Sequence, residues 1–398
     1  MYNFICEVRD SDLERVGQIR PDDLDLEYFG FHNAPGSWSL VLPAEHDMVP
    51  HLRAPGSGLV VTLENGKVLF SGPTRVWKRE ITQDDLLGTF VAEGHDDTIA
   101  LAHRICYPQP AVAWDGQDFD LVDERTGTVE DLLHAYTNAN LGPGALAPRR
   151  LTNFTMGLNP GRGTIITKRA KGEKLIDFLN ESAQAHGFGF RIAQFAPGSR
   201  ALQTYEIVDR TKLIRMDAQN RTLSGEKVSV GWPVLTRALL AGGPADPEIE
   251  GDPPGPRTLL EGSSMRSALA EMDWDIRIEE FLDSRSSNDT VEHAEAVAER
   301  LTEDGFTLIS AQLVPLEDEV MRFGAEDGWY IGDDITAVID EQEVVATVTG
   351  VAVKIDGDGV RLGAALGDPY NFSHAEVMRR KIKKLERRLL YLESRFLG

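Results

Sequence analysis

Short runs of β-branched and apolar residues, separated by turn signals, dominate the first part of the chain. The clearest two runs, residues 59–63 and 68–71, flank Asn65-Gly66. Asn-Gly in this setting predicts a β-hairpin, because a type I′ turn needs a positive φ at both of its central positions. Similar runs lie at residues 37–43 and 89–94. Residues 1–110 are therefore predicted to form a small antiparallel β-barrel or sandwich.

Residues 111–240 combine helical and strand patterns. One helix is predicted to open at Thr128 and to stop before Gly142-Pro143. A second, at residues 174–186, has apolar residues at helical spacing and ends at Gly187. Strand patterns follow at residues 188–192 and 204–208. This part of the chain is predicted to be an α+β domain.

Residues 241–262 are dense in Pro, Gly and acidic residues, so they are predicted to form an exposed loop. An α+β segment is predicted at residues 263–325. It contains an alternating strand at 275–281 and a helix at 291–303.

The pattern returns to β-structure in residues 326–370. Two runs, 335–339 and 344–348, flank an acidic turn, and a last hairpin turns at 356–359. The predicted fold class is therefore α+β and rich in β-structure, with two small β-barrel or sandwich domains and inserted α+β domains.

The first and last β segments also resemble each other. Residues 58–72 and 332–350 both have the order glycine, strand, acidic turn, strand, glycine. Any two hairpins can share this outline, so coincidence is one explanation. If the two segments are copies, three chains would present six similar modules around an axis.

The C-terminal segment, residues 371–398, differs from the rest. From Met378 to Gly398 there are eight Lys/Arg against two Glu. A capping box, Ser373 to Glu376, opens a predicted helix. Apolar residues then recur at alternating spacings of four and three: Met378, Ile382, Leu385, Leu389, Leu392 and Phe396.

That spacing predicts the a/d seam of a coiled coil. The seam covers only about three heptads, so the body of the protein has to oligomerise too. An amphipathic helix lying on its own domain is the alternative. Its basic surface would also suit an acidic partner or the anionic surface of a membrane.

Charge and composition exclude several classes of function. A formal net charge of -23 argues against broad nucleic-acid binding, because phosphates would be repelled. Cys6 and Cys106 are too few for a disulfide framework and are predicted to be buried thiols. No secretory signal and no run of roughly 18 apolar residues is visible. We therefore expect a soluble protein made in a cytoplasm.

The sequence offers no catalytic constellation, no metal site and no cofactor motif. The glycine-rich stretch from Asn159 to Gly163 lacks the Lys and hydroxyl of a phosphate loop, so a turn is predicted there. The nine His residues are scattered. The neighbours Asp209 and Arg210, and likewise Arg277 and Glu279, are predicted to form structural ion pairs. We expect no enzymatic activity.

Several motifs, in order along almost the whole chain, resemble one family of proteins. They are residues 38–43 (WSLVLP), 69–72 (LFSG), 103–110 (HRICYPQP), 175–192, 274–283, 328–333 (GWYIGD) and 366–369 (LGDP), followed by the basic helix. The sequence is similar to the minor tail or baseplate hub proteins of siphoviruses that infect actinobacteria. These are distant relatives of the hub proteins of contractile tails and injection particles.

The resemblance implies a homotrimer at the tail tip of a virion, with two barrels per subunit in a ring. The implied partners are the distal tail protein or tail tube ring, the tape measure protein and receptor-binding or fibre proteins. DNA would pass through an acidic lumen that does not retain phosphate.

Two other functions stay open at this stage. A receptor-binding tail protein would need an aromatic groove for cell-wall sugar, for which Trp114, Phe119 and Trp232 are candidates. A tail-tip cell-wall hydrolase would need paired carboxylates, a zinc site or an activated nucleophile.

Overall fold

The computed structural model describes residues 4–81, 87–217, 219–220, 222–244, 255–284, 290–305, 308–315, 322–339, 342–357 and 359–366. The chain divides into two compact units. Unit 1 consists of Met1–Glu226 and Gln312–Gly398, and unit 2 of Lys227–Ala311. Each unit is described by itself.

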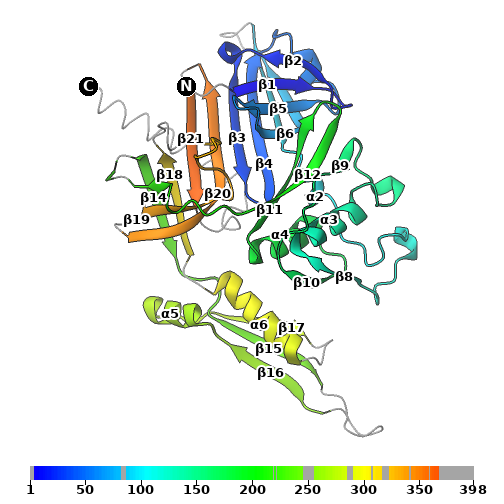
Figure 1. The fold of residues 1–398 in the computed structure, drawn as a ribbon, viewed down its shortest axis with the longest axis vertical. Helices are drawn as coiled ribbons and strands as arrows, with labels where there is room; N and C mark the ends of the chain where they lie inside the picture. Colours follow the sequence, from blue (N-terminus) through cyan, green and yellow to red (C-terminus); the bar gives the residue numbers. More distant parts are fainter. Residues whose placement is uncertain are drawn as a thin grey trace. The chain divides into compact units, whose positions relative to one another are not determined.

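A large sheet forms the body of unit 1 (Figure 1). Its described strands follow the order β14-β18-β21-β20-β3-β4-β7-β6-β5-β1-β2, and β19 pairs with β20 and with β13. The strands are β1 Phe4–Arg9, β2 Arg15–Ile19, β3 Asp25–Phe31, β4 Ala34–Pro43, β5 Gly58–Leu63, β6 Val68–Glu80, β7 Thr89–His95, β13 Arg215–Met216, β14 Leu223–Gly231, β18 Leu308–Pro315, β19 Asp334–Ile339, β20 Gln342–Asp356 and β21 Gly359–Leu366.

The first and last β segments of the chain belong to this one sheet. Strand β20 pairs with β3 in antiparallel fashion, with Ala352 opposite Phe29. The sequence assigned these strands to two separate barrels, and the structure joins them by backbone hydrogen bonds. Long β6 joins the two parts of the sheet, because its first half pairs with β5 and its second half with β7.

The alternation seen in the sequence sets which side chains enter the core. On β4, Trp38, Leu40 and Leu42 point inward and each is at most 3% exposed. The residues between them are partly exposed. A period of two is the pattern of a sheet with one buried face.

The hairpin between β5 and β6 forms as predicted, but its turn type is different. The amide of Gly66 donates to the Leu63 carbonyl at 2.8 Å, and Gly66 has a φ of +81°. Asn65 is not among the residues with positive φ. The predicted type I′ turn is therefore wrong. The geometry is a type I turn followed by a left-handed glycine. Asn65 instead donates from Nδ2 to the Gly324 carbonyl at 2.9 Å.

Between β7 and β13 the chain forms an α+β lobe of unit 1. Its helices α3, Val129–Asn140, and α4, Leu175–Ala185, confirm the two predicted helices, and the Thr128 hydroxyl caps α3 by accepting from the Asp131 amide. A core of eighteen buried residues, Tyr136 and Phe178 among them, joins both helices to the strands. The remaining elements are α2 Ile99–Ala102, β8 Asp123–Thr128, β9 Phe154–Met156, β10 Ile165–Ala170, β11 Phe188–Ala196, β12 Ser199–Glu206 and the short helices α1 Val49–Leu52, η1 Pro21–Asp23, η2 Trp114–Gly116 and η3 Ala147–Arg149.

Unit 2 is a three-stranded sheet covered by a helix. Strand β15, Arg237–Pro244, pairs with β16, Arg257–Gly262, and with β17, Glu279–Ser284. Helix α6, Thr290–Asp304, confirms the predicted helix and packs Val297 and Leu301 against this sheet.

Two sequence predictions in unit 2 are wrong. The loop predicted at 241–262 is wrong at its two ends, because residues 241–244 belong to β15 and residues 257–262 form β16, and the two strands pair with each other. Burial alternates along most of both strands, because they pair in one sheet that α6 covers. Residues 245–254 lie outside the described residues. The strand predicted from residue 275 begins at Glu279, because helix α5, Met265–Trp274, ends at Asp275 with a φ of 49°.

The predicted coiled coil, including all six seam residues, lies outside the described residues. Among the helices that the structure does describe, none is both long and apolar enough to cross a membrane.

Candidate functional site

The α+β lobe meets the sheet at a junction rich in charged side chains. Strand β11 carries Arg191 and Gln194 to this junction, β1 carries Arg9, and the turn after β7 carries Asp96 and Asp97. Successive side chains of a strand point to opposite faces. Phe190 and Ile192 of β11 point into the core of the lobe, so Arg191 between them points to the sheet. The junction fixes how the lobe sits on the sheet.

A buried ion pair lies at the centre of one half of the junction. The guanidinium of Arg9 donates to both Asp97 carboxylate oxygens, at 2.7 and 2.8 Å, and both residues are 1% exposed. Arg200 and Ser71 donate to the same carboxylate at 3.0 and 2.6 Å. Gln194 accepts from Arg9 at 3.1 Å.

Electrostatics keep this carboxylate ionised. Burial alone would raise the pKa of Asp97, but the charge and hydrogen bonds of Arg9, with help from Arg200 and Ser71, hold it below its usual value. Two cations around one buried anion form a network in which removal of either sign leaves an uncompensated charge.

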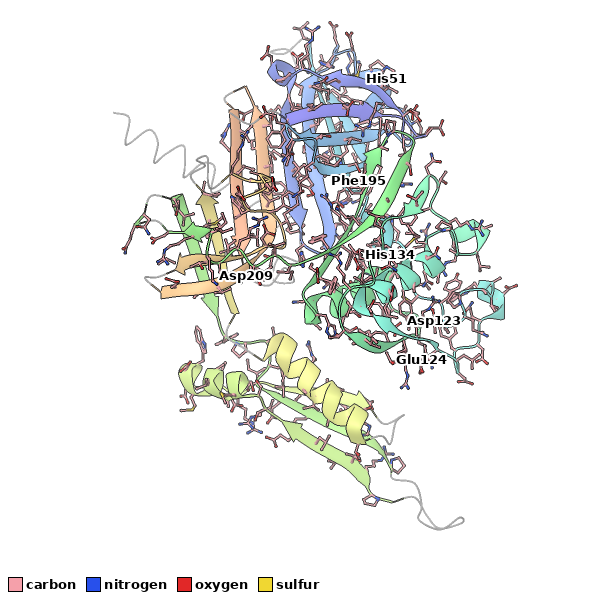
Figure 2. All side chains as sticks on the ribbon, in the orientation of Figure 1. His51, Asp123, Glu124, His134, Phe195 and Asp209 are labelled. Atoms are coloured by element: carbon pink, nitrogen blue, oxygen red, sulfur yellow. The ribbon has the colours of Figure 1, made fainter. Side chains whose placement is uncertain are left out.

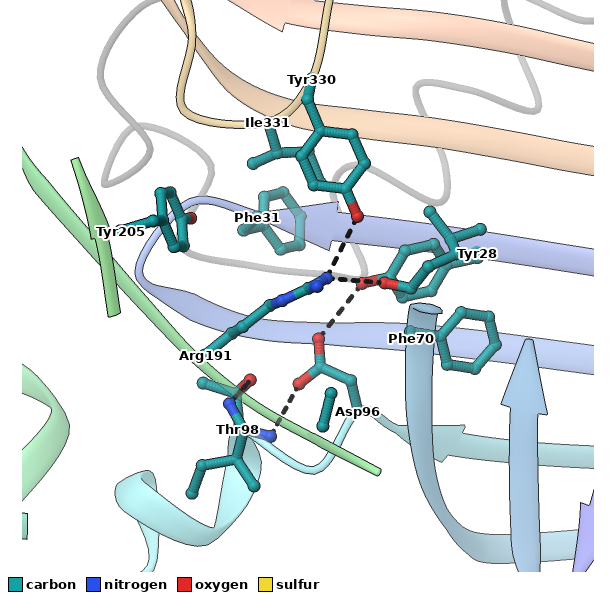
Figure 3. Close-up of a pocket in the computed structure, with 12 residues that line it drawn as sticks. Tyr28, Phe31, Phe70, Asp96, Thr98, Arg191, Tyr205, Tyr330 and Ile331 are labelled. Atoms are coloured by element: carbon teal, nitrogen blue, oxygen red, sulfur yellow. Dashed lines mark hydrogen bonds between the residues drawn. The ribbon is translucent and has the colours of Figure 1, made fainter. Parts of the chain in front are cut away.

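The other half of the junction is a small pocket (Figure 3). Arg191 donates to the Val68 and Leu69 carbonyls at 3.1 and 3.3 Å and to the Tyr330 hydroxyl at 3.1 Å. Lys67 lies 3.4 Å from the centre of the Tyr330 ring, a cation–π contact. Burial lowers the pKa of Lys67 to about 8, and the nearby charge of Arg191 adds to the effect.

Asp96 lies in the same pocket. Its carboxylate accepts from the Gly36 amide at 2.7 Å and the Tyr28 hydroxyl at 3.3 Å. Burial raises its pKa to about 6. The free space measures about 20 Å³, room for about one water molecule, whereas ligand pockets reach several hundred Å³. This pocket is too small for a sugar.

A third charged group fixes the turn from Asn159 to Gly163 onto the lobe. Arg162 donates to Glu130 at 2.6 and 3.0 Å, and the Thr204 hydroxyl donates to it at 2.7 Å. Burial opposes the ionisation of Glu130, but these hydrogen bonds outweigh it and lower the pKa to about 2. Gly161 and Gly163 have positive φ, which confirms the predicted turn.

Cys6 and Cys106 are both free and buried, as predicted. Burial raises the pKa of each thiol to about 12, so neither is a ready nucleophile. The part of the chain that the structure describes contains no group of three His, Cys, Asp or Glu placed to hold a metal ion.

Of the two predicted ion pairs, one forms. Arg277 pairs with Glu279 at 2.7 Å. The predicted pair of Asp209 and Arg210 is wrong, because Arg210 pairs with Asp333 at 2.9 Å and Asp209 accepts from Thr211 instead.

Two of the three aromatic candidates for a sugar groove lie together. Trp114 and Phe119 contact edge to face, with ring centres 5.6 Å apart, and both are exposed. Trp232 belongs to unit 2 and is exposed there.

The junction residues were missed by sequence reasoning. Their only signal is a charged residue within an apolar strand run, as for Arg9 in FICEVR and Arg191 in FGFRIA. Arg9 and Asp97 are 88 positions apart in the sequence, and Arg191 and Tyr330 are 139 positions apart.

Comparison with known proteins shows which family the chain belongs to. The family model described as "Siphovirus ReqiPepy6 Gp37-like protein" matches residues 5–368. The chain belongs to this family. The predicted resemblance to siphovirus proteins is therefore confirmed. No curated protein sequence matches the chain.

Solved structures show that this family member has the fold of phage tail proteins. The 43 kDa tail protein of prophage MuSo2 from Shewanella oneidensis superimposes with a TM-score of 0.57 at 11% identity, covering 93% of this chain and 99% of that chain. A tail protein from Neisseria meningitidis gives a TM-score of 0.53 at 12% identity, covering 92% and 97%.

Proposed function

We propose that this siphovirus protein is a structural component of the tail, a homotrimeric hub at the tail tip. The main support is that its fold matches phage tail proteins over almost the full length of both chains. A likeness limited to one domain would be compatible with many functions, because folds are reused. Here the sheet, the lobe and the inserted unit are matched together.

The character of the charged sites supports a structural role. The buried pairs Arg9–Asp97 and Glu130–Arg162 are joined by hydrogen bonds within the chain, and the junction pocket has room for about one water molecule. Such sites hold elements in place. A general acid or base needs access to a substrate, and these carboxylates lack it. We infer that the chain has no enzymatic role, and no contact in the described residues favours a cell-wall hydrolase.

The trimer would use the C-terminal segment as its coil. The six seam residues, Met378, Ile382, Leu385, Leu389, Leu392 and Phe396, would pack around the axis. The hub would close the tail tube and join the distal tail protein or tube ring, the tape measure protein and the receptor-binding proteins. Its net charge of -23 is compatible with a lumen that lets DNA pass during ejection.

The solution mass of the purified protein, measured by light scattering, tests this function. The full chain is expected to be a trimer, and a chain lacking residues 373–398 is expected to dissociate at higher concentration. A control variant with Arg379→Lys and Arg380→Lys, two positions outside the seam, should remain a trimer. A full chain that stays monomeric over the whole concentration range would contradict the hub.

A further inference from the structure

Unit 1 exposes an aromatic loop, residues 107–122, that is held rigid by its own hydrogen bonds. The side chain of Gln117 donates to the Gln109 carbonyl at 2.9 Å and accepts from the Gln109 amide at 3.0 Å. The Asp118 amide donates to the Gln109 side chain at 3.0 Å. These bonds close the neck of the loop, so its tip has a defined shape.

The tip of the aromatic loop is apolar and acidic. Trp114 is 57% exposed and Phe119 42%. Asp115, Asp118 and Asp120 surround them and are exposed, and residues 107–122 contain no Lys or Arg. Large aromatic side chains grouped on a surface and rimmed by charge are typical of a protein interface.

A second exposed surface, the basic strand end, has the opposite charge. It is the second half of β6, residues 74–80, where every residue from Arg75 to Glu80 is exposed. Trp77 and Arg79 share one face of the strand. Arg75 lies at the β-bulge between Thr74 and Val76, and its guanidinium is 3.1 Å from His95 Nε2. Arg53 adds to this surface, with its guanidinium 4.6 Å from the Trp77 ring. Among the described strands, only β7 pairs with this half of β6.

These two surfaces lie at different ends of unit 1. Figure 2 shows His51, in helix α1 two residues before Arg53, far from Asp123, which directly follows the aromatic loop. A single chain therefore does not join its own two surfaces. Two copies can, because a contact between different patches of identical chains forms a ring when its rotation closes.

We propose that the aromatic loop of one copy docks on the basic strand end of the next copy. The inference rests on the proposed trimer and names the interface that closes it. The carboxylates of the loop meet the guanidinium groups of Arg53 and Arg79, with Arg75 at the edge of the contact, while Trp114 and Phe119 meet Trp77. Trp and Arg are the residues that most often dominate binding at the centre of interfaces. The charges select the orientation, because two acidic loops or two basic strand ends would repel each other.

A charge reversal in the full chain tests the proposal. Asp115→Lys with Asp120→Lys changes the loop at two side chains that cap no backbone in the described structure. Arg75→Glu with Arg79→Glu changes the strand end. Each pair alone is expected to raise the concentration at which the trimer dissociates by roughly tenfold or more. All four substitutions together are expected to restore it to within about threefold of the wild type.

A matched control carries the same change in charge elsewhere. Asp12→Lys with Asp22→Lys alters two exposed carboxylates outside both surfaces and is expected to leave the trimer unchanged. Light scattering over a dilution series gives the mass, and circular dichroism confirms that each variant is folded. Recovery in the fourfold variant would itself show that neither pair prevents folding.

The outcomes separate the two proposals. A wild-type chain that is monomeric removes the trimer and the interface together. A wild-type trimer that survives both charge reversals leaves the hub in place and overturns the interface. Reversals that weaken the trimer without recovery in the fourfold variant also overturn it, because the two surfaces then do not contact each other.

Discussion

At the scale of single residues, unit 1 contains a buried ion pair at the junction of its lobe and its sheet. Arg9 and Asp97 come from opposite sides of the junction, and each is 1% exposed. A buried ion pair adds little stability over an apolar pair of the same shape, but breaking it is costly, because one charge is left without its partner. The junction is therefore specific in orientation and sensitive to substitution.

Replacing Asp97 tests this sensitivity. Asp97→Asn keeps the shape but leaves Arg9 and Arg200 without their carboxylate, so the free energy of unfolding is expected to fall by about 3–5 kcal/mol. Urea denaturation at neutral pH measures it. Asp12→Asn, at an exposed position, is the control and should change little. Equal midpoints for the two variants would show that the network is not essential.

Asp96 predicts a pH dependence of its own. Its pKa is about 6 in the folded state against 3.8 for an ordinary Asp, so the folded state binds the proton more tightly than the unfolded chain. As pH rises from 3.8 to about 6, stability is lost, and the loss persists above that range. The difference corresponds to about 3 kcal/mol.

Comparison with Asp96→Asn isolates this effect from the other carboxylates. The stability of the variant relative to the wild type is expected to increase across this pH range, as measured by urea denaturation at each pH. Asp97 has the opposite sign. Its lowered pKa gives stability that is present above pH 3.8 and is lost as the pH falls through the folded pKa. If the difference in unfolding free energy between Asp96→Asn and the wild type stays constant with pH, the raised pKa of Asp96 is contradicted.

At the scale of elements, local signals decided which segments became helices and strands. Thr128 caps α3 and apolar spacing defines α4, as the sequence indicated. The β5–β6 hairpin formed with a different turn, in which only Gly66 has a positive φ and Asn65 donates to the Gly324 carbonyl. The sequence therefore predicted the position of this turn correctly and its backbone conformation wrongly.

Two glycines test the turn. Gly66 has a φ of +81° and open space around it, so Gly66→Ala is expected to lose about 1–2 kcal/mol from backbone strain alone. Gly357 is equally open but has no positive φ, so Gly357→Ala is the matched control and should be neutral or slightly stabilising. Thermal unfolding of both variants gives the comparison. Equal effects would show that the turn relaxes without strain.

At the scale of the whole molecule, unit 2 is an insertion in the chain of unit 1 that begins within β14 and ends within β18. Its sheet and α6 enclose a separate core that includes Leu240, Val297 and Leu301. A unit with its own core is expected to fold by itself.

Expression of residues 227–311 alone tests this independence. The fragment is expected to unfold cooperatively in urea, because α6 already covers one face of its sheet. Leu301, 4% exposed, fills that contact, so Leu301→Ala should lower the free energy of unfolding by about 2–5 kcal/mol. A fragment without a cooperative transition would show that unit 2 needs the rest of the chain.

The sequence by itself indicated an α+β fold rich in β-structure, both helices of the lobe, helix α6 and about half of the strands of the large sheet, namely β4 to β7 and β19 to β21. It also led to the siphovirus family that the comparison confirms. These features could be predicted because periodicity, caps and turns act between residues that are close in the sequence. The seam of the C-terminal segment is a prediction of the same kind and lies outside the described residues.

Only the tertiary structure decided which distant segments meet. Strand β20 pairs with β3, Arg9 pairs with Asp97, and Asn65 donates to the Gly324 carbonyl. Residues 241–244 and 257–262 form strands because each has a neighbouring strand to pair with. Backbone hydrogen bonding and burial depend on the partner that packing supplies, and a single sequence carries no direct record of that partner.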